Sequence, residues 1–311
     1  MAEKIATRES YGNALAALGD KYDFVVLDAD LAAATKTGTF KKKFPERFFD
    51  CGIAEGNMMS VAAGIATTGK PVFASSFAMF AAGRAFEQIR NSISYPNLNV
   101  KIGATHAGIT VGEDGATHQC LEDIALMRSI PGMIVINPAD DVEAKAAVEA
   151  ALNVNGPVYL RFGRMAVPVF NKPDYKFELG KGVKLVDGKD VTIVATGIMV
   201  DMAVEAAKLL ANEGISARVI NIHTIKPLDN EIIAAAAKET GAIVTAEEHN
   251  IYGGLGSAVA EAVCESCPVP VLRIGTEDKF GHSGKVPPLL EMYGLTVENI
   301  IAKAKAAIAL K

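Results

Sequence analysis

Apolar and polar positions alternate along the chain in two different ways. Short runs rich in β-branched residues are typical of buried strands, and longer stretches with apolar residues three or four apart are typical of helices. In the first half, strands are predicted at residues 24–27, 71–74, 100–103, 133–136 and 157–160. Helices are predicted at residues 10–18, 55–67, 84–93, 121–129 and 141–152. This alternation indicates a parallel sheet covered by helices on both faces.

A second, shorter series follows in the other half of the chain. Strands are predicted at residues 191–195, 217–220, 242–245 and 269–272, and helices at residues 200–211, 231–238, 255–265 and 297–307. The intervening segment is rich in Pro, Gly, Lys and Asp and lacks sustained periodicity, which predicts a linker. We therefore expect an α/β protein of two doubly wound domains, residues 1–168 and 189–311, joined by a linker at residues 169–188.

Composition and charge exclude several classes of protein. The chain has 311 residues, 50% of them hydrophobic, which excludes a disordered chain, and its net charge is −5. Its one basic cluster, Lys41-Lys42-Lys43, is typical of a solvated turn, so we expect no nucleic-acid partner. No stretch approaches the roughly 18 apolar residues of a membrane span, and residues 1–8 lack the apolar core of a signal peptide. We expect a cytoplasmic protein that does not bind membranes.

Cysteines and the second domain offer little chemistry. The four cysteines are Cys51, Cys120, Cys264 and Cys267, too few for a secreted disulfide framework. Cys264 and Cys267 have the spacing of a redox pair or of half a zinc site, but no second ligand pair exists and buried thiols are the simpler interpretation. Glu247-Glu248-His249 and the glycine-rich residues 253–256 favour packing or a subunit contact.

Polar and aromatic residues follow the predicted strands of the first domain, where open parallel sheets bind ligands. They are Asp28 and Asp30, Ser75, Ser76, Phe77 and Phe80, His106 and His118 in a loop at residues 105–119, and Arg161 and Arg164. The loop holds two of the five histidines in the chain but matches no common phosphate-binding glycine pattern. Hydrogen bonding to a polar substrate is therefore favoured over metal binding.

Glu55 opens a predicted helix of otherwise small and apolar residues. A carboxylate at that place can cap the helix and interact with its dipole. If it is buried against an apolar interface instead, the protonated carboxyl is favoured, which suits proton exchange near neutral pH. Asp30 can likewise be a helix cap, and Phe77 and Phe80 can belong to the core.

Together these segments resemble the pyrimidine-binding and C-terminal domains of transketolase, a thiamine-diphosphate enzyme. They occur in the family's order, at residues 6–8, 28–31, 49–55, 75–80, 106–119 and 253–257. The V-G-E-D-G-A-T-H-Q sequence at residues 111–119 is the most specific of them. The resemblance implies a doubly wound pyrimidine-binding fold followed by a smaller transketolase C-terminal-like domain.

One part of the family's pattern is absent. Transketolases hold magnesium and the cofactor diphosphate with an N-terminal domain that carries a Gly-Asp-Gly motif, and this sequence has none. The resemblance therefore implies the second half of a split transketolase, with a separate N-terminal subunit and a heterotetramer of two plus two chains. Thiamine diphosphate is the implied cofactor, Mg²⁺ is expected on the partner subunit, and no metal site is expected in this chain. The implied reaction moves a two-carbon ketol unit from a ketose phosphate to an aldose phosphate.

The resemblance also implies roles for single residues. Glu55 would contact N1′ of the aminopyrimidine and favour its imino tautomer, and His118 would hydrogen-bond near the reacting carbonyl, so these two are the expected catalytic residues. The expected cofactor-binding residues are Glu55, Phe77, Phe80, Asp30 and Leu31. The expected substrate-binding residues are His106, Asp114, His118, Arg8 and Arg164, in which the two arginines and His106 hold the sugar phosphate.

Two departures and three alternatives accompany the resemblance. Gly83 stands where many transketolases have a further aromatic residue, and Ala34 stands where a serine helps to bind phosphate. The β subunit of a 2-oxoacid dehydrogenase has this length and layout, although Asp114 and His118 suit sugar hydroxyls better than an acyl acceptor. A deoxyxylulose-phosphate synthase normally keeps both halves in one chain. A non-catalytic interaction module would not need the polar residues at the strand ends.

Overall fold

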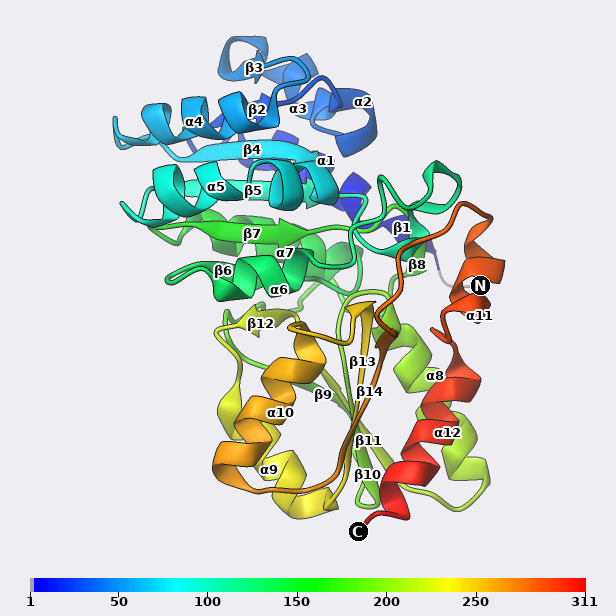
Figure 1. Cartoon of the computed structure of the whole chain (residues 1–311). Coiled ribbons are helices and arrows are strands. Elements are labelled where there is room, and N and C mark those ends of the chain that lie inside the picture. The colour runs from blue at the N-terminus through cyan, green and yellow to red at the C-terminus, as the bar shows by residue number, and fades with distance from the viewer. Residues whose placement is uncertain (1–2) are drawn as a thin grey trace.

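The computed structural model describes residues 3–311, in which two sheets lie one above the other (Figure 1). The strands of the upper sheet are β2 (Val25–Asp28), β3 (Phe48–Asp50), β4 (Val72–Phe77), β5 (Val100–Thr105), β6 (Ile134–Ile136), β7 (Val158–Arg161) and β12 (Thr224–Lys226). They follow the order β12-β6-β7-β5-β4-β2-β3. Every pair is parallel except β12 with β6, so a strand from the second half of the chain completes the first sheet.

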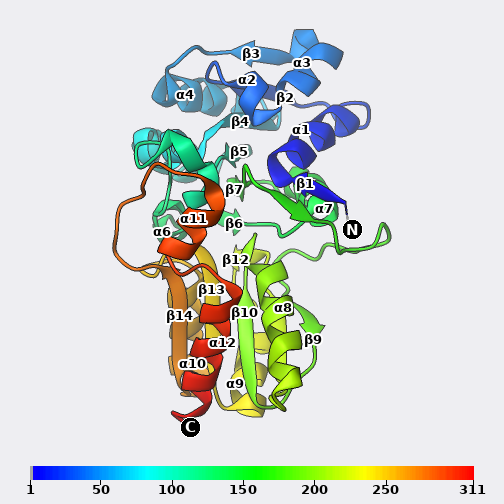
Figure 2. The same cartoon turned by 90° about the vertical axis from the view of Figure 1, so that its right-hand side faces the viewer.

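Helices cover both faces of the upper sheet (Figure 2). On one face α1 (Thr7–Leu18) packs against α7 (Asp141–Leu152). On the other face lie α4 (Glu55–Ala66), α5 (Phe86–Gln88) and α6 (Asp123–Ser129). The remaining helical segments of this domain are α2 (Ala32–Thr35), α3 (Gly38–Lys43), the 3₁₀ turns η1 (Pro45–Arg47) and η4 (Ile109–Asp114), and the π-helical turns η2 (Met79–Arg84) and η3 (Ile89–Ser94).

α7 illustrates why these segments are helical. Its small apolar residues Ala144, Ala147, Val148 and Ala151 recur three or four positions apart and are all buried on one face. The Asp140 side chain accepts a hydrogen bond from the Glu143 N–H, 2.9 Å away, and so caps the helix start.

The lower sheet consists of β9 (Val183–Val186), β10 (Val191–Ala195), β11 (Ala217–Asn221), β13 (Ile243–Asn250) and β14 (Val271–Thr276). Its order is β14-β13-β10-β11-β9, and only β9 is antiparallel to its neighbour. α8 (Met199–Asn212) and α12 (Val297–Ile308) pack together on one face, and α9 (Asn230–Thr240) and α10 (Leu255–Ser266) on the other. The predicted α/β fold of two sheets that are mainly parallel is confirmed.

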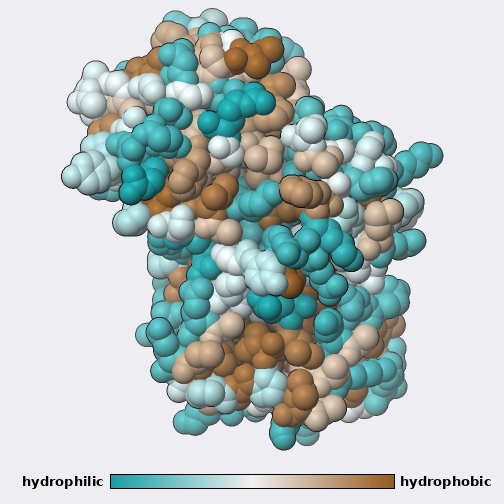
Figure 3. Space-filling view, viewed as in Figure 1, coloured by the Kyte–Doolittle hydropathy of each residue, from teal (hydrophilic) through white to brown (hydrophobic). Residues whose placement is uncertain are grey.

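Hydrophobic residues gather on the surface over β14, the edge strand of the lower sheet (Figure 3). Val271 and Leu272 of this strand are only partly buried. Of the helices in residues 3–311, none combines the length and the apolar character that crossing a bilayer requires.

The two domains do not have separate cores. One apolar cluster contains Met58 and Met59 of α4 and Ile102 of β5, and continues into Ile220 of β11 and Ile233 of α9. The cluster is continuous because β12 and the segments around it carry apolar side chains across the junction.

Five strands and three α-helices arise where the hydrophobic pattern predicts none. The unexpected strands are β3, β9, β12 and the pair β1 (Lys4–Ala6) and β8 (Ala166–Pro168), and the unexpected helices are α2, α3 and α11 (Val286–Met292). Lys41-Lys42-Lys43, expected in a turn, ends α3. β9 lies inside the predicted linker and pairs with β11. The strand expected at residues 269–272 instead spans residues 271–276, because pairing with β13 decides its ends.

Glu143 joins three parts of the chain at the domain junction. Its buried carboxylate accepts hydrogen bonds from the Ala139 N–H at 2.7 Å, the Tyr175 hydroxyl of the linker at 2.8 Å and the Asn221 side-chain amide of β11 at 2.8 Å. Burial raises the pKa of Glu143 to about 7 despite these bonds.

This pKa predicts how stability depends on pH. The folded-state value lies above the ordinary one, so the contribution of Glu143 is present below about pH 4.5 and is lost as pH rises through 7. We expect the free energy of unfolding to fall over this range, by at most about 3 kcal/mol from this group. Glu143→Gln should flatten the slope in urea unfolding at pH 5 and pH 7.5. Parallel pH profiles of the two proteins would contradict the expectation.

Candidate functional site

The order of the upper sheet brings the predicted polar residues together. β7, β5, β4 and β2 are successive neighbours, and all run in the same direction. Phe77 at the end of β4 is paired in register with Thr105 at the end of β5, and Ala104 with Arg161 of β7. The carboxyl ends of these strands thus form one edge, as expected for an open α/β sheet.

Glu55 is the first residue of α4, and it is only 2% exposed. Both of its carboxylate oxygens accept hydrogen bonds from Nη1 of Arg84, each at 3.2 Å. The Arg84 guanidinium lies over the Phe80 ring, 4.5 Å from its centroid, while its side chain remains about half exposed. The Arg84 guanidinium therefore lies between the buried Glu55 carboxylate, to which it donates, and the face of the Phe80 ring.

Four aromatic rings continue from this point along the edge. Phe80 lies 5.7 Å from Phe77 and 5.2 Å from His118 between ring centroids. Phe77 stacks on the His106 imidazole at 3.8 Å, with an interplanar angle of 25°. The structure therefore brings Phe77, Phe80, His106 and His118 into mutual contact, as the sequence predicts.

His106 ends the row against Arg8. Nη1 of Arg8 lies 2.9 Å from Nε2 of His106 and 3.1 Å from the Ala34 carbonyl oxygen. Arg8 has no lone pair to offer, so Nε2 accepts the bond and the imidazole proton is assigned to Nδ1, which donates to the Thr105 hydroxyl at 2.9 Å. Burial, followed by the charges of Arg8 and Arg164, lowers the pKa of His106 to about 3. The charge of this cluster therefore lies on the arginines.

The remaining predicted substrate residues are Asp114, in the loop between β5 and α6, and Arg164, which follows β7. Nη1 of Arg164 donates to the Val111 carbonyl, and it lies 3.6 Å from the Glu113 carboxylate. Asp114 is exposed at the end of η4. Arg164 thus contacts the loop that carries Asp114 and His118, and among the described residues no hydrogen bond or ring contact joins Arg164 or Asp114 to the four rings.

Asp30 and Leu31 are held through their backbone. The Asp30 N–H donates to the Asp50 carboxylate at 3.1 Å, and the Leu31 N–H donates to the Asp28 carboxylate at 2.6 Å. Asp30 has φ 60°, a left-handed conformation that aspartate adopts more readily than most residues. Its side chain is exposed.

Two residues here were not singled out from the sequence. Arg84, the partner of Glu55, lies where a helix is predicted, and no sequence pattern distinguishes it from a solvated helical arginine. Met79 occupies the place that Gly83 leaves, because a Cβ on Gly83 would collide with the Met79 methyl group.

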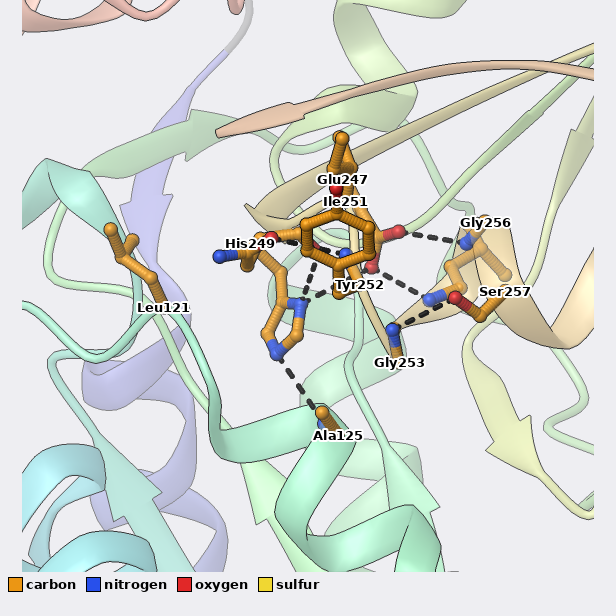
Figure 4. Close-up of polar contacts among 12 residues, drawn as sticks. Leu121, Ala125, Glu247, His249, Ile251, Tyr252, Gly253, Gly256 and Ser257 are labelled. Atoms are coloured by element: carbon orange, nitrogen blue, oxygen red, sulfur yellow. Dashed lines mark hydrogen bonds and ion pairs between the residues drawn. The ribbon is translucent and has the colours of Figure 1, made fainter. Parts of the chain in front are cut away.

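In the second domain, Glu247, Glu248 and His249 make packing contacts, and Figure 4 shows those of Glu247 and His249. The Glu247 carboxylate accepts hydrogen bonds from the first two N–H groups of α10, both at 2.7 Å. Nε2 of His249 accepts from the Ala125 N–H of α6 at 3.3 Å. Glu248 accepts from the Thr110 N–H at 2.7 Å. Glu248 and His249 therefore hold the first domain to the second.

Other candidate features lie apart from this edge. A surface cavity of about 730 Å³ lies between α1 and α7 and includes none of the predicted site residues. Residues 3–311 contain no group of three or more His, Cys, Asp or Glu side chains placed to hold a metal ion. Cys264 and Cys267 are free, the first exposed and the second partly buried.

Comparison with known families settles the family of the chain. Residues 3–169 match the transketolase pyrimidine-binding domain, and residues 180–300 match the transketolase C-terminal domain. The chain belongs to the transketolase family. The resemblance stated from the sequence is confirmed, including the position of this chain as the C-terminal part of a split transketolase.

Similar proteins of this family are single chains of nearly the same length. A Methanocaldococcus jannaschii protein named for a transketolase C-terminal section is 54% identical, over 94% of this chain and 93% of its own. A 6-deoxy-6-sulfo-D-fructose transketolase subunit of Clostridium sp. is 45% identical, over 96% and 92%. An apulose-4-phosphate transketolase subunit of Phocaeicola vulgatus is 41% identical, over 96% of both chains.

Solved and full-length transketolases agree with this placement. A split-gene transketolase, described as an inactive beta tetramer, superposes with a TM-score of 0.92 at 55% identity, over 99% of this chain and 100% of its own. Human transketolase is 39% identical over 98% of this chain, which spans only 49% of the human protein. The chain is thus equivalent to about half of a full-length transketolase.

The low pKa of His106 predicts its behaviour in this transketolase chain. Its folded-state value lies below the ordinary 6.5, so its contribution to stability is present above pH 6.5 and is lost as pH falls toward 3. NMR of labelled histidine should show His106 neutral from pH 8 to pH 5. Arg8→Met should raise the pKa, because it removes the nearest positive charge. A His106 signal that titrates near 6.5 in the unmodified chain would contradict the assignment.

Proposed function

We propose that this chain is the C-terminal subunit of a two-chain transketolase. With thiamine diphosphate and Mg²⁺, the complex transfers a two-carbon ketol unit from a ketose to an aldose that carry a terminal phosphate or a similar anion. The observation that supports this most is the row of contacts from Glu55 through Arg84, Phe80, Phe77 and His106 to Arg8. It joins the buried Glu55 carboxylate to the Arg8 guanidinium along one sheet edge.

The residues around Glu55 fit the pyrimidine part of the cofactor. Arg84 brings a flat group with N–H donors onto the Phe80 ring and the Glu55 carboxylate. An aminopyrimidine with a proton at N1′ would offer the same flat face and donor, so Arg84 occupies the place proposed for the ring and leaves it when cofactor binds. Glu55 then holds the proton at N1′, and the cofactor supplies the carbon nucleophile of ketol transfer.

Aromatic and backbone contacts complete the proposed cofactor site. Phe80 offers a partly exposed face for stacking, and Phe77 supports it from the buried side. Asp30 and Leu31 are proposed to lie near the bend of the cofactor, because the hydrogen bonds of their N–H groups fix the chain directly after β2, where Asp30 is exposed.

Substrate binding is assigned to the opposite end of the row. Arg8 and Arg164 are proposed to pair with the terminal anion, and neutral His106 to hydrogen-bond to it. Asp114 is proposed to accept a hydrogen bond from a sugar hydroxyl, and His118 to donate one near the reacting carbonyl. Ala34 offers only its carbonyl oxygen, so no side-chain hydroxyl at that position selects phosphate. Relatives named for a sulfonated and a phosphorylated sugar support testing both anions.

A separate N-terminal subunit is proposed to hold the diphosphate and Mg²⁺. Residues 3–311 contain no carboxylate cluster for the metal, and the chain equals about half of human transketolase. The similar split-gene chain, described as an inactive beta tetramer, supports a need for this partner. We propose a heterotetramer of two plus two chains, with each active site between the two kinds of subunit.

Reconstitution tests the proposed function. Ketol transfer is measured with thiamine diphosphate and Mg²⁺, using this chain alone and mixed with the N-terminal transketolase subunit of the same organism. We expect activity only in the mixture, and Glu55→Ala should lower kcat by about 10²-fold or more, because the proton at N1′ loses its partner. Glu298→Ala is the matched control, since Glu298 is an exposed carboxylate in the first turn of α12. No transfer by a mixture that forms a complex would contradict the function.

Arg84→Ala tests whether Arg84 occupies the pyrimidine position. In the isolated chain we expect a lower Tm, because the buried Glu55 carboxylate loses the partner it has there. In the reconstituted complex, calorimetry should give an equal or smaller dissociation constant for thiamine diphosphate, since no arginine has to be displaced. Arg90→Ala, at an exposed arginine of the neighbouring turn, serves as control. Weaker cofactor binding by Arg84→Ala would show that Arg84 holds the cofactor instead.

A further inference from the structure

A segment of the second domain lies on the loop that carries Asp114 and His118. Residues 277–285 connect β14 to α11, and Figures 1 and 2 show this orange segment and α11 beside the loop between β5 and α6. The Ser283 hydroxyl donates to the Glu113 carbonyl oxygen at 2.6 Å. Glu113 immediately precedes Asp114, so this bond fixes the backbone at the proposed substrate residue.

Gln119 makes the second connection between the segment and the loop. Its buried side-chain amide donates to the His282 carbonyl oxygen at 2.9 Å and to the carbonyl oxygens of Ile109 and Gly112 at 3.1 and 3.3 Å. One amide group thus ties the first residue of the 3₁₀ turn η4 and the kink at Gly112 to the second domain. All three acceptors are backbone carbonyl oxygens, so their positions are set by the backbone of the loop and of the segment. The conformation of the loop therefore depends on the Gln119 amide.

The close approach of the two backbones requires glycine. A Cβ on Gly281 would collide with the Gln119 amide oxygen, whose side chain is held by its hydrogen bonds. Gly115 of the loop has φ 76°, and a Cβ there would lie 3.2 Å from the Ser283 Cβ. A further hydrogen bond holds residues 277–285 within the second domain, because the Tyr293 hydroxyl donates to the Phe280 carbonyl oxygen at 2.6 Å.

We propose that Ser283 is a positioning residue, which holds the Glu113–Asp114 turn of the first domain in the conformation that binds the sugar. It does not touch the reacting atoms. Its hydroxyl and the Gln119 amide act together to keep Asp114 and His118 at a fixed separation. This role rests on the proposed function, because the residues that it positions are those proposed to bind substrate.

Two measurements on Ser283→Ala test the proposal. In the isolated full-length chain, hydrogen exchange of residues 109–119 should become faster, a result that does not depend on activity. In the reconstituted complex, KM for the sugar should rise about fivefold, as expected for one lost hydrogen bond, while kcat and thiamine diphosphate affinity change little. Ser283→Thr, which keeps the hydroxyl, should restore both values.

Ser266→Ala provides the matched control. Ser266 is also exposed, and its hydroxyl also donates to a backbone carbonyl, at 2.6 Å, but at the end of α10. The proposal is wrong if Ser283→Ala gives the same exchange and KM as this control. It is also wrong if exchange increases while KM stays unchanged, because the turn would then be held without serving substrate binding. An unmodified mixture without transferase activity would contradict the proposed function, whereas the exchange result would still show whether Ser283 holds the turn.

Discussion

A fully buried ion pair between Arg161 and Asp123 is the contact on which the arrangement of both domains depends. Nε of Arg161 lies 2.8 Å from the Asp123 carboxylate, which also accepts from the Tyr159 hydroxyl at 2.8 Å. Burial alone would raise the pKa of Asp123, but the Arg161 charge and these hydrogen bonds hold it below its ordinary value. Arg161 also donates to the Glu248 carbonyl oxygen of β13 at 2.9 Å. Because a buried charge tolerates little displacement from its partner, the end of β7, the start of α6 and the second domain stay in register.

The fold was largely predictable from sequence because most strands are buried, apolar and separated by amphipathic helices. The missed strands are short ones that tertiary pairing creates. β12 has three residues, Thr-Ile-Lys, and is a strand only because β6 lies beside it. β9 lies in a segment rich in lysine and glycine, in which apolar and polar residues do not alternate clearly as they do in a strand. α11 begins with Val-Pro-Pro, and local propensity does not distinguish this start from a turn. Local pattern therefore identifies the layers, but not the strands at their edges.

The region of the candidate site could also be predicted from the sequence, but the individual side-chain contacts within it could not. Parallel strands place their carboxyl ends on one edge, so Phe77, His106 and Arg164 could be assigned to one region from order alone. Order does not separate Arg164, which contacts the substrate loop, from Arg161 three residues earlier, which is used up in the ion pair. Contacts made by side chains from elsewhere, such as Arg84 on Glu55 or Ser283 on the loop, have no sequence signal because each depends on the completed fold.

In the proposed two-chain enzyme, this subunit has to fold before the subunit that completes its active site binds. Glu55 illustrates the constraint, because a buried carboxylate without a partner is costly, whereas its proposed ligand comes only with the complex. Arg84 resolves the conflict in the isolated chain, since its guanidinium pairs with both oxygens while its side chain stays half exposed. An exposed guanidinium returns to water at little cost, so the contact that stabilises the free subunit need not oppose cofactor binding strongly. The same reasoning applies to residues 109–119, proposed to bind substrate, which the second domain of this chain contacts through the Gln119 amide and the Ser283 hydroxyl.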